Sequence, residues 1–134
     1  MRSSSERCRV FTTRWFAKAA ARAGISEAAL CKASRELSLG QGDNLGGGVW
    51  KKRAEKNLYR EIVLAKAGYW WIFVYLFQKR DRANISRDEL LAFREMAALY
   101  SKDADIAGKN SLCVLNEICQ HESKTSARIQ VTCL

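Results

Sequence analysis

The 134-residue chain contains no proline, only one histidine and fewer acidic than basic residues. Without proline, its turns must rely on glycine, on asparagine and on helix caps. The single histidine, His121, lies far from the basic region, residues 46–87, so a mechanism with paired histidines is disfavoured there. The same region holds no group of carboxylates suited to a magnesium ion. Metal-dependent and two-histidine hydrolysis are therefore both disfavoured.

Long apolar segments are also missing. The longest apolar run, residues 69–77, has nine residues, whereas a membrane-spanning helix needs about 20. The first ten residues lack the apolar stretch of a secretory signal. We therefore expect a cytoplasmic protein that does not associate with membranes, and we expect residues 1–8 to be disordered.

The cysteines form no recognisable binding pattern. Their number is odd and no pair is spaced as CxxC; they are Cys8, Cys31, Cys113, Cys119 and Cys133. With one histidine in the chain, this is poor material for a zinc site. We expect reduced thiols and no metal or other cofactor, with Cys31 on a helix as a small apolar residue.

The chain is strongly positive and has a globular composition. It has 23 lysines and arginines against 14 acidic residues, a net charge of +9, and 48% hydrophobic residues. Ten of the basic residues and only three acidic ones lie in residues 46–87. This balance favours a polyanionic partner, above all nucleic acid. The simpler alternative is a surface that only keeps the protein soluble, or one masked by an acidic partner.

The N-terminal third predicts a short strand and a helical hairpin. Residues 10–13 have strand character, and a helix is expected over residues 14–23. Gly24 is suited to end that helix, because glycine adopts the left-handed conformation of a C-terminal cap. Ser26 can cap a second helix that extends to Ser38.

A third helix is predicted by a capping box. Ser86 and Glu89 have the required spacing before an apolar-periodic segment, residues 87–101. Residues 40–48 are rich in glycine and are expected to form a loop. A weaker helical segment is expected within residues 104–119.

Three strands are predicted between the hairpin and the third helix. Residues 49–53, 58–65 and 69–77 are rich in strand-forming residues, and short links join them into an antiparallel meander. The last is continuously apolar, as in a central strand covered on both faces. The predicted fold class is α+β, with the helical hairpin packed on a curved antiparallel sheet and a helix after it. We expect one domain, residues 1–119, and a C-terminal tail, residues 120–134.

The cations of the meander are predicted to gather on one face. Tight turns would place Lys51 opposite Arg60, and Arg60 opposite Tyr75. On that register one face holds Lys51, Arg53, Arg60, Tyr75, Phe77 and Lys79, and the other holds Trp50, Lys52, Glu61, Val74 and Leu76. Cations with aromatic rings suit RNA, because cations meet phosphates and rings stack on unpaired bases. For Lys56 and Lys66, in turns, a solubilising role is preferred. A mid-strand arginine is costly unless it has a task, which favours a functional Arg60.

Four segments together resemble the RelE/ParE superfamily of type II toxins. They are "LGGGVWKKR", "LYREIVLAKAG", "WWIFVYLFQKRDRANI" and "DELLAFREMAALY". The resemblance covers residues 10–119 and is closest to the phage-protein-like RelE branch, related to the HigB toxins. It implies a RelE-like fold and metal-independent cleavage of mRNA in the ribosomal A site. The 2′-hydroxyl would attack the adjacent phosphate, and a cognate antitoxin, of the helix-turn-helix type, would neutralise the toxin.

The resemblance, together with the predicted basic face, gives the candidate site residues. The catalytic candidates are Lys51, Lys52, Arg60, Lys79 and Arg82, and the RNA-binding candidates are Arg53, Tyr75, Phe77 and Arg80. On the resemblance, Lys51 or Lys52 would be the base, Arg60 would stabilise the transition state, and Lys79 or Arg82 would support the leaving group or bind phosphate. The link "AEKN" is shorter than in many members of the branch, and the tail from Gln120 has no counterpart. Two alternatives stay open, a ParE-like poison of DNA gyrase and an inactive binding module. The basic sheet favours the nuclease over the gyrase poison.

Overall fold

The computed structural model describes residues 8–66, 69–102 and 115–119, and these form an α+β fold. In chain order the elements are β1 (Arg9–Thr13), α1 (Arg14–Ala23), α2 (Glu27–Ser38), β2 (Asp43–Gly46), β3 (Val49–Ala54), β4 (Tyr59–Lys66), β5 (Trp70–Gln78), α3 (Arg87–Ser101) and β6 (Leu115–Ile118). The predicted class, helical hairpin, meander and third helix are confirmed. The tail, residues 120–134, and most of the expected disordered segment lie outside the described residues.

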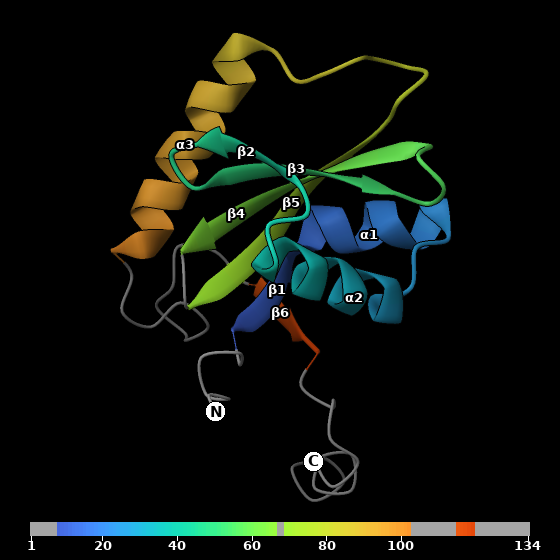
Figure 1. Ribbon diagram of the computed structural model, residues 1–134, viewed down its shortest axis with the longest axis horizontal. Helices are drawn as coiled ribbons and strands as arrows, with labels where there is room; N and C mark the ends of the chain where they lie inside the picture. The colour runs from blue at the N-terminus through green and yellow to red at the C-terminus, as the bar shows by residue number, and fades with distance from the viewer. Residues whose placement is uncertain (1–7, 67–68, 103–114, 120–134) are drawn as a thin grey trace, which may run out of the picture.

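The strands form one six-stranded sheet in the order β2-β3-β4-β5-β1-β6. Strand β1 pairs in parallel with β5, whereas the other pairs are antiparallel. The sheet is therefore mixed rather than purely antiparallel. Figure 1 shows α1 and α2 against one side of the sheet and α3 against the other. Strand β5, with a neighbour on each side, lies at the centre of this arrangement.

Strand β5 supplies apolar side chains to both faces of the sheet. Trp71 and Phe73 join Phe16 of α1 in the core under the helical hairpin. Trp70 and Ile72 belong to the core under α3. Because successive strand residues point to opposite faces, a strand covered twice must be apolar throughout. The continuous apolar run is thereby explained, and its prediction as a central strand is confirmed.

The register predicted from tight turns is wrong by two residues. Lys51 lies opposite Ile62, and Arg60 lies opposite Arg53 on one side and Phe77 on the other. Between β3 and β4 the reason is the turn, which is longer than a tight hairpin because Ala54 pairs with Tyr59. Between β4 and β5 one residue of the shift is already present where Lys66 pairs with Trp70, and the second arises at a bulge between Ile62 and Val63. A shift of two residues keeps the alternation of faces.

The predicted membership of the two faces is therefore largely kept, with two corrections. A bulge shifts the β4–β5 register between Ile62 and Val63, so Tyr75 pairs with Ile62 and Phe73 with Val63. Val74, left between them, turns to the α3 side instead of the hairpin side. Lys79 lies beyond the end of β5 and belongs to neither face.

Two strands were missed by the sequence reasoning. Residues 43–46 form β2 inside the segment expected to be a loop. Residues 115–118 form β6, where a weak helix was expected, and the rest of that expected helix lies in residues 103–114, outside the described part. Both strands are short edge strands that pair with one neighbour, β3 or β1. Pairing with the sheet rather than local propensity stabilises them.

A glycine turn connects β2 to β3 and is held by α3. Gly46, Gly47 and Gly48 all have positive φ, at 89°, 64° and 84°. Arg94 of α3 donates to the carbonyl oxygens of Leu45, at 2.6 Å, and Gly46, at 3.3 Å. A Cβ on Gly48 would lie 3.0 Å from the carbonyl oxygen of Ala65. The glycine triplet therefore allows both the turn and the close approach of the neighbouring strand.

Replacing Gly48 by alanine should destabilise the protein more than the same change at Gly40. Gly40 has a φ of 85° and open space around its missing Cβ, so Gly40→Ala measures backbone strain alone. That strain costs about 1 kcal/mol. Gly48→Ala adds steric overlap, worth roughly 1–3 kcal/mol more. Urea unfolding of both variants checks this, and equal losses would show that the contact with Ala65 relaxes freely.

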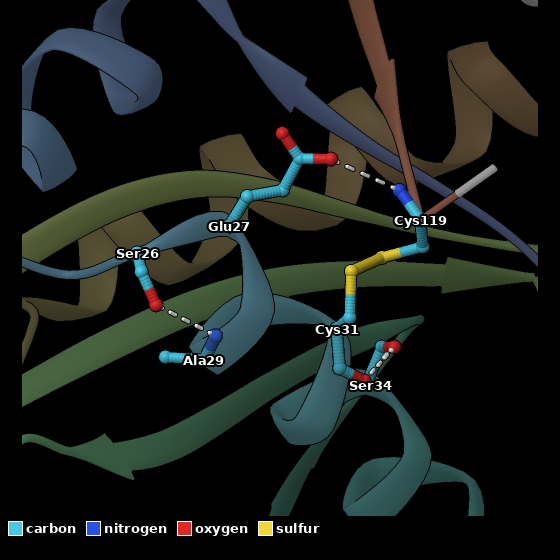
Figure 2. The surroundings of a disulfide bond; sticks show 6 residues. All are labelled: Ser26, Glu27, Ala29, Cys31, Ser34 and Cys119. Carbon is cyan, nitrogen blue, oxygen red and sulfur yellow. Dashed lines mark hydrogen bonds between the residues drawn. A yellow bond between two sulfur atoms is a disulfide. The ribbon is translucent and has the colours of Figure 1, made fainter. Parts of the chain in front are cut away.

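The expectation of reduced thiols is corrected at one pair. Cys31, on α2 as predicted, forms a disulfide with Cys119, just after β6, across 88 residues of sequence. Figure 2 shows the pair beside Glu27, whose carboxylate accepts a hydrogen bond from the backbone N–H of Cys119 at 3.4 Å. The spacing of cysteines in the sequence could not reveal this pair, because α2 and β6 meet only in the folded chain. The bond ties an edge strand to the helical hairpin.

Reduction of this disulfide should lower the free energy of unfolding. Closing a loop of this length reduces the entropy of the unfolded chain and stabilises the fold by roughly 4–5 kcal/mol. Urea unfolding with and without a thiol reductant measures the difference. A Cys31→Ser, Cys119→Ser double variant should match the reduced protein and should not respond to reductant. An oxidised protein no more stable than this variant would contradict the expectation.

Candidate nucleic-acid interface

Two rows of side chains cross three adjacent strands on the α3 side of the sheet. Lys51, Ile62 and Tyr75 form one row, and Arg53, Arg60 and Phe77 form the next. Neighbouring strands lie about 4.8 Å apart, so each row is a set of close neighbours. We call these two rows the cationic face; as predicted, it combines cations with aromatic rings.

Arg82 anchors the chain that leaves β5. Its guanidinium donates to the carboxylate of Glu89, to the Tyr75 hydroxyl at 3.3 Å and to the Asn84 carbonyl oxygen at 3.0 Å. It also lies over the Phe77 ring, with its Cζ 5.5 Å from the ring centroid, which is within the distance of about 6 Å for a cation–π contact. This arginine therefore fixes the two aromatic side chains of the cationic face.

Glu89 serves the Arg82 ion pair and the α3 cap together. Its carboxylate accepts from the backbone N–H of Ser86 at 2.7 Å, while the Ser86 hydroxyl accepts from the backbone N–H of Glu89. The predicted capping box is therefore confirmed. The hydrogen bond from Arg82, with that from Ser86, lowers the pKa of Glu89 to about 2. The carboxylate thus stays ionised at neutral pH and holds Arg82 in place.

Lys51 and Arg60 are the cations that the sheet positions on this face. The Lys51 ammonium donates to the side-chain oxygen of Asn84 at 3.3 Å. One Arg60 nitrogen, Nη1, donates to the carbonyl oxygens of Asn57, at 3.2 Å, and Tyr59, at 3.1 Å. Within the described part of the chain, the other guanidinium nitrogens of Arg60 make no hydrogen bond. Arg60 is half-buried and keeps donors available for a ligand.

The remaining candidate cations differ in where they lie, and only Arg53 belongs to the cationic face. Lys52 lies on the opposite face, where its ammonium forms an ion pair with Glu36 of α2 at 2.9 Å. Arg53, Lys79 and Arg80 are exposed, and their side chains make no ion pair or hydrogen bond with any described residue. The structure therefore brings together Lys51, Arg53, Arg60, Tyr75, Phe77 and Arg82, and separates Lys52 from them. The prediction of Phe77 as an RNA contact is corrected, because its ring is 6% exposed and belongs to the core under α3.

The sequence reasoning missed two aromatic residues beside this face. Trp15, in the first turn of α1, stacks on Tyr75 with ring centroids 5.3 Å apart and an interplanar angle of 22°. Phe93 of α3 contacts Tyr75 from another side at 6.0 Å. A signal was present for Trp15, because Lys18 and Arg22, three and seven residues later on the same side of the helix, are charged and place the tryptophan outside the apolar stripe.

A buried carboxyl lies behind the face, on the hairpin side. Glu61 is 1% exposed, and its Oε1 has no hydrogen-bond partner among the residues that the structure describes. Burial raises the pKa of Glu61 to about 8, although the nearby Lys52 opposes the shift. The carboxyl is therefore largely protonated at neutral pH, which avoids the cost of burying a charge.

The free energy of unfolding should fall as pH rises through the range in which Glu61 is deprotonated in the unfolded chain but still protonated in the folded protein. The unfolded carboxyl titrates at its ordinary pKa of 4.5, whereas the folded one holds its proton until about pH 8. Between these values the unfolding free energy falls by up to about 1.4 kcal/mol per pH unit. Urea unfolding over this range should show the loss in the wild type. Glu61→Gln should remove it, and parallel pH profiles for the two proteins would contradict the assignment.

The described residues offer few other features of a site. No group of three or more histidine, cysteine, aspartate or glutamate side chains gathers there in a way that could hold a metal ion. In the same residues, no helix is long and apolar enough to cross a membrane.

Comparison with known protein families identifies the chain. The model of the RelE toxin of the RelE/RelB toxin–antitoxin system matches residues 8–114. The protein is therefore the toxin component of a type II toxin–antitoxin system. It belongs to the RelE toxin family, and its partner is a cognate antitoxin. Comparisons with curated proteins and with solved structures found no match.

Proposed function

We propose that this toxin is a cytoplasmic, ribosome-dependent endoribonuclease that cuts mRNA without a metal ion. We further propose that it belongs to the HigB-related branch and is neutralised by a helix-turn-helix antitoxin. The observation that carries the activity is the cationic face, on which Lys51 and Arg60 lie in adjacent rows with Tyr75 and Phe77. A single-stranded codon could bind there with a base against the half-buried Tyr75 and phosphates against the cations. The Phe77 ring, 6% exposed, packs beside Tyr75 and supports it.

The proposed reaction is an attack of a 2′-hydroxyl on the adjacent phosphate. A bond forms between the 2′-oxygen and phosphorus, and the bond from phosphorus to the 5′-oxygen breaks. The products are a 2′,3′-cyclic phosphate and a 5′-hydroxyl end. The proton of the attacking hydroxyl is taken up by a base, and the leaving 5′-oxygen gains a proton.

Lys51 is the better of the two candidate bases. It lies on the cationic face and is oriented by Asn84, whereas Lys52 forms an ion pair with Glu36 on the other side of the sheet. We assign proton removal from the 2′-hydroxyl to Lys51. Lys79, exposed just after β5, is assigned to the leaving group, with Arg80 as a phosphate contact.

Arg82 is better suited to positioning than to direct contact with RNA. Most of its donors are committed to Glu89, Tyr75 and Asn84. Asn84 in turn accepts from Lys51, so one arginine orders an aromatic ring and, indirectly, the candidate base. We therefore assign transition-state stabilisation to Arg60, whose Nε and Nη2 are available, with Arg53 as a further phosphate contact.

Arg60→Ala should fold and bind antitoxin but lose activity. Removing one preorganised donor to the developing charge costs on the order of 3 kcal/mol, or about a hundredfold in rate. Cleavage of mRNA on programmed ribosomes and growth inhibition at equal soluble expression measure the loss. Arg60→Lys keeps the charge but not the planar fork, and should recover only part of the activity.

The control for this experiment is Arg35→Ala. Arg35 is an exposed arginine on α2, on the hairpin side of the sheet, and its removal should leave activity unchanged. If folded Arg60→Ala cuts and kills as well as the wild type, Arg60 is structural. Growth arrest by the wild type without cleaved mRNA, and with inhibited DNA gyrase, would contradict the nuclease and support the gyrase alternative.

A further inference from the structure

Trp15 is the tryptophan that the fold leaves open to solvent. It is 49% exposed, whereas Trp70 and Trp71 are 5% and 7% exposed in the two cores. Trp50 is half-buried against Trp71, with ring centroids 5.8 Å apart. Trp15 belongs to neither hydrophobic core, so its large ring is not explained by packing of the interior.

The indole of Trp15 extends the aromatic cluster of the cationic face outward. One of its ring faces stacks on Tyr75, which also contacts Phe77 at 5.8 Å and Phe93 at 6.0 Å. The hydrogen bond from Arg82 fixes the Tyr75 hydroxyl, so the ring on which Trp15 stacks is held in one orientation. Trp15 is therefore a preorganised, half-exposed aromatic surface at the edge of a cationic surface.

The surroundings of Trp15 are positive. Arg14, Lys18 and Arg22 recur every four residues on α1 and are exposed, so they line one side of the helix. The helix contains no acidic residue. Lys18 lies one turn from Trp15, at the i, i+3 spacing that makes helix side chains neighbours. A phosphate backbone could follow this row while a base meets the indole.

We propose that Trp15 is a nucleobase-stacking site for an unpaired base of single-stranded RNA. The base binds against the open indole face, beside the half-buried Tyr75, and its flanking phosphates meet Arg14 and Lys18. This site deepens the proposed nuclease function, because it would determine which base is preferred beside the cleaved phosphate. Every base has a π-face, so the site discriminates by stacking strength rather than by hydrogen bonding.

Loss of the ring should weaken RNA binding in a graded way. Stacking of one base on an aromatic side chain contributes enough that its removal weakens binding roughly 10- to 100-fold. Trp15→Ala and Trp15→Leu should show this loss, whereas Trp15→Phe, which keeps an aromatic ring, should retain most of the affinity. Leu39→Ala is the matched control, because Leu39 is also a large exposed apolar residue, at 74%, and lies at the end of α2.

The first measurement uses a short single-stranded RNA with 2′-deoxy substitutions, which prevent the attack by the 2′-hydroxyl. Its affinity for the toxin and the variants is measured by fluorescence anisotropy of a labelled strand. Binding should also quench the tryptophan emission of the wild type, and this quenching should be lost in Trp15→Phe. Equal affinity for wild type, Trp15→Ala and Leu39→Ala would overturn the proposal, as would absence of RNA binding by the wild type.

The second measurement uses ribosomes programmed with mRNA and compares cleavage sites and single-turnover rates. Trp15→Ala should shift the preference for the base beside the cut and raise KM more than it lowers kcat. An unchanged cleavage pattern and rate, with an active wild type, would overturn the stacking site and leave the nuclease function intact. RNA binding that depends on Trp15, in a wild type that cuts no mRNA, would support the site and contradict the nuclease.

A different macromolecule could also use an exposed tryptophan. The affinity of each variant for the purified cognate antitoxin therefore forms a third arm. If Trp15→Ala weakens antitoxin binding and leaves RNA affinity unchanged, the residue anchors a protein and the proposal is wrong. If RNA affinity falls and antitoxin binding is unchanged, the proposal holds.

Discussion

The two hydrophobic cores and the cationic face all depend on one strand that is buried on both faces and paired on both edges. Strand β5 separates two hydrophobic cores, with Phe73 on the hairpin side and Ile72 on the α3 side, both fully buried. Beyond the bulge at Val74, the α3 side of the strand presents Tyr75, which is only half-buried, and Phe77. The same strand thus supplies the core and then the aromatic side chains of the cationic face. That is why an apolar segment leads directly into cations.

The cationic face is held by the segment that follows β5 as well as by the sheet. Arg82 connects Tyr75 to Glu89, and Glu89 also caps α3. The position of α3 is thereby coupled to the orientation of the rings. In the middle of α3, Arg94 holds the turn before β3, and Lys51 is the third residue of that strand. One helix therefore supports both borders of the candidate site without contributing a catalytic candidate.

Local signals predicted most elements, and contacts between distant segments could not be predicted. Helix caps at Ser26 and Ser86 depend on a few adjacent residues, so their prediction from sequence was correct. The pairing of Arg60 with Arg53 depends on the length of the β3–β4 turn, and its pairing with Phe77 depends on the bulge in β5; the local sequence determines neither. The bond between Cys31 and Cys119 and the stack of Trp15 on Tyr75 join residues more than 50 positions apart. Between β3 and β4 the alternation of faces survived the error in register because that error was two residues, an even number.

The parallel pairing of β1 with β5 has a consequence for synthesis of the protein. Residues 9–13 must wait for residues 70–78 before they gain their central neighbour, so the first strand has no sheet to join while the chain is short. Until then, the apolar faces of α1 and α2 also lack their main support. Contacts over such sequence separations form late. A nascent chain on its own ribosome therefore has no assembled cationic face until the central strand and Arg82 have emerged.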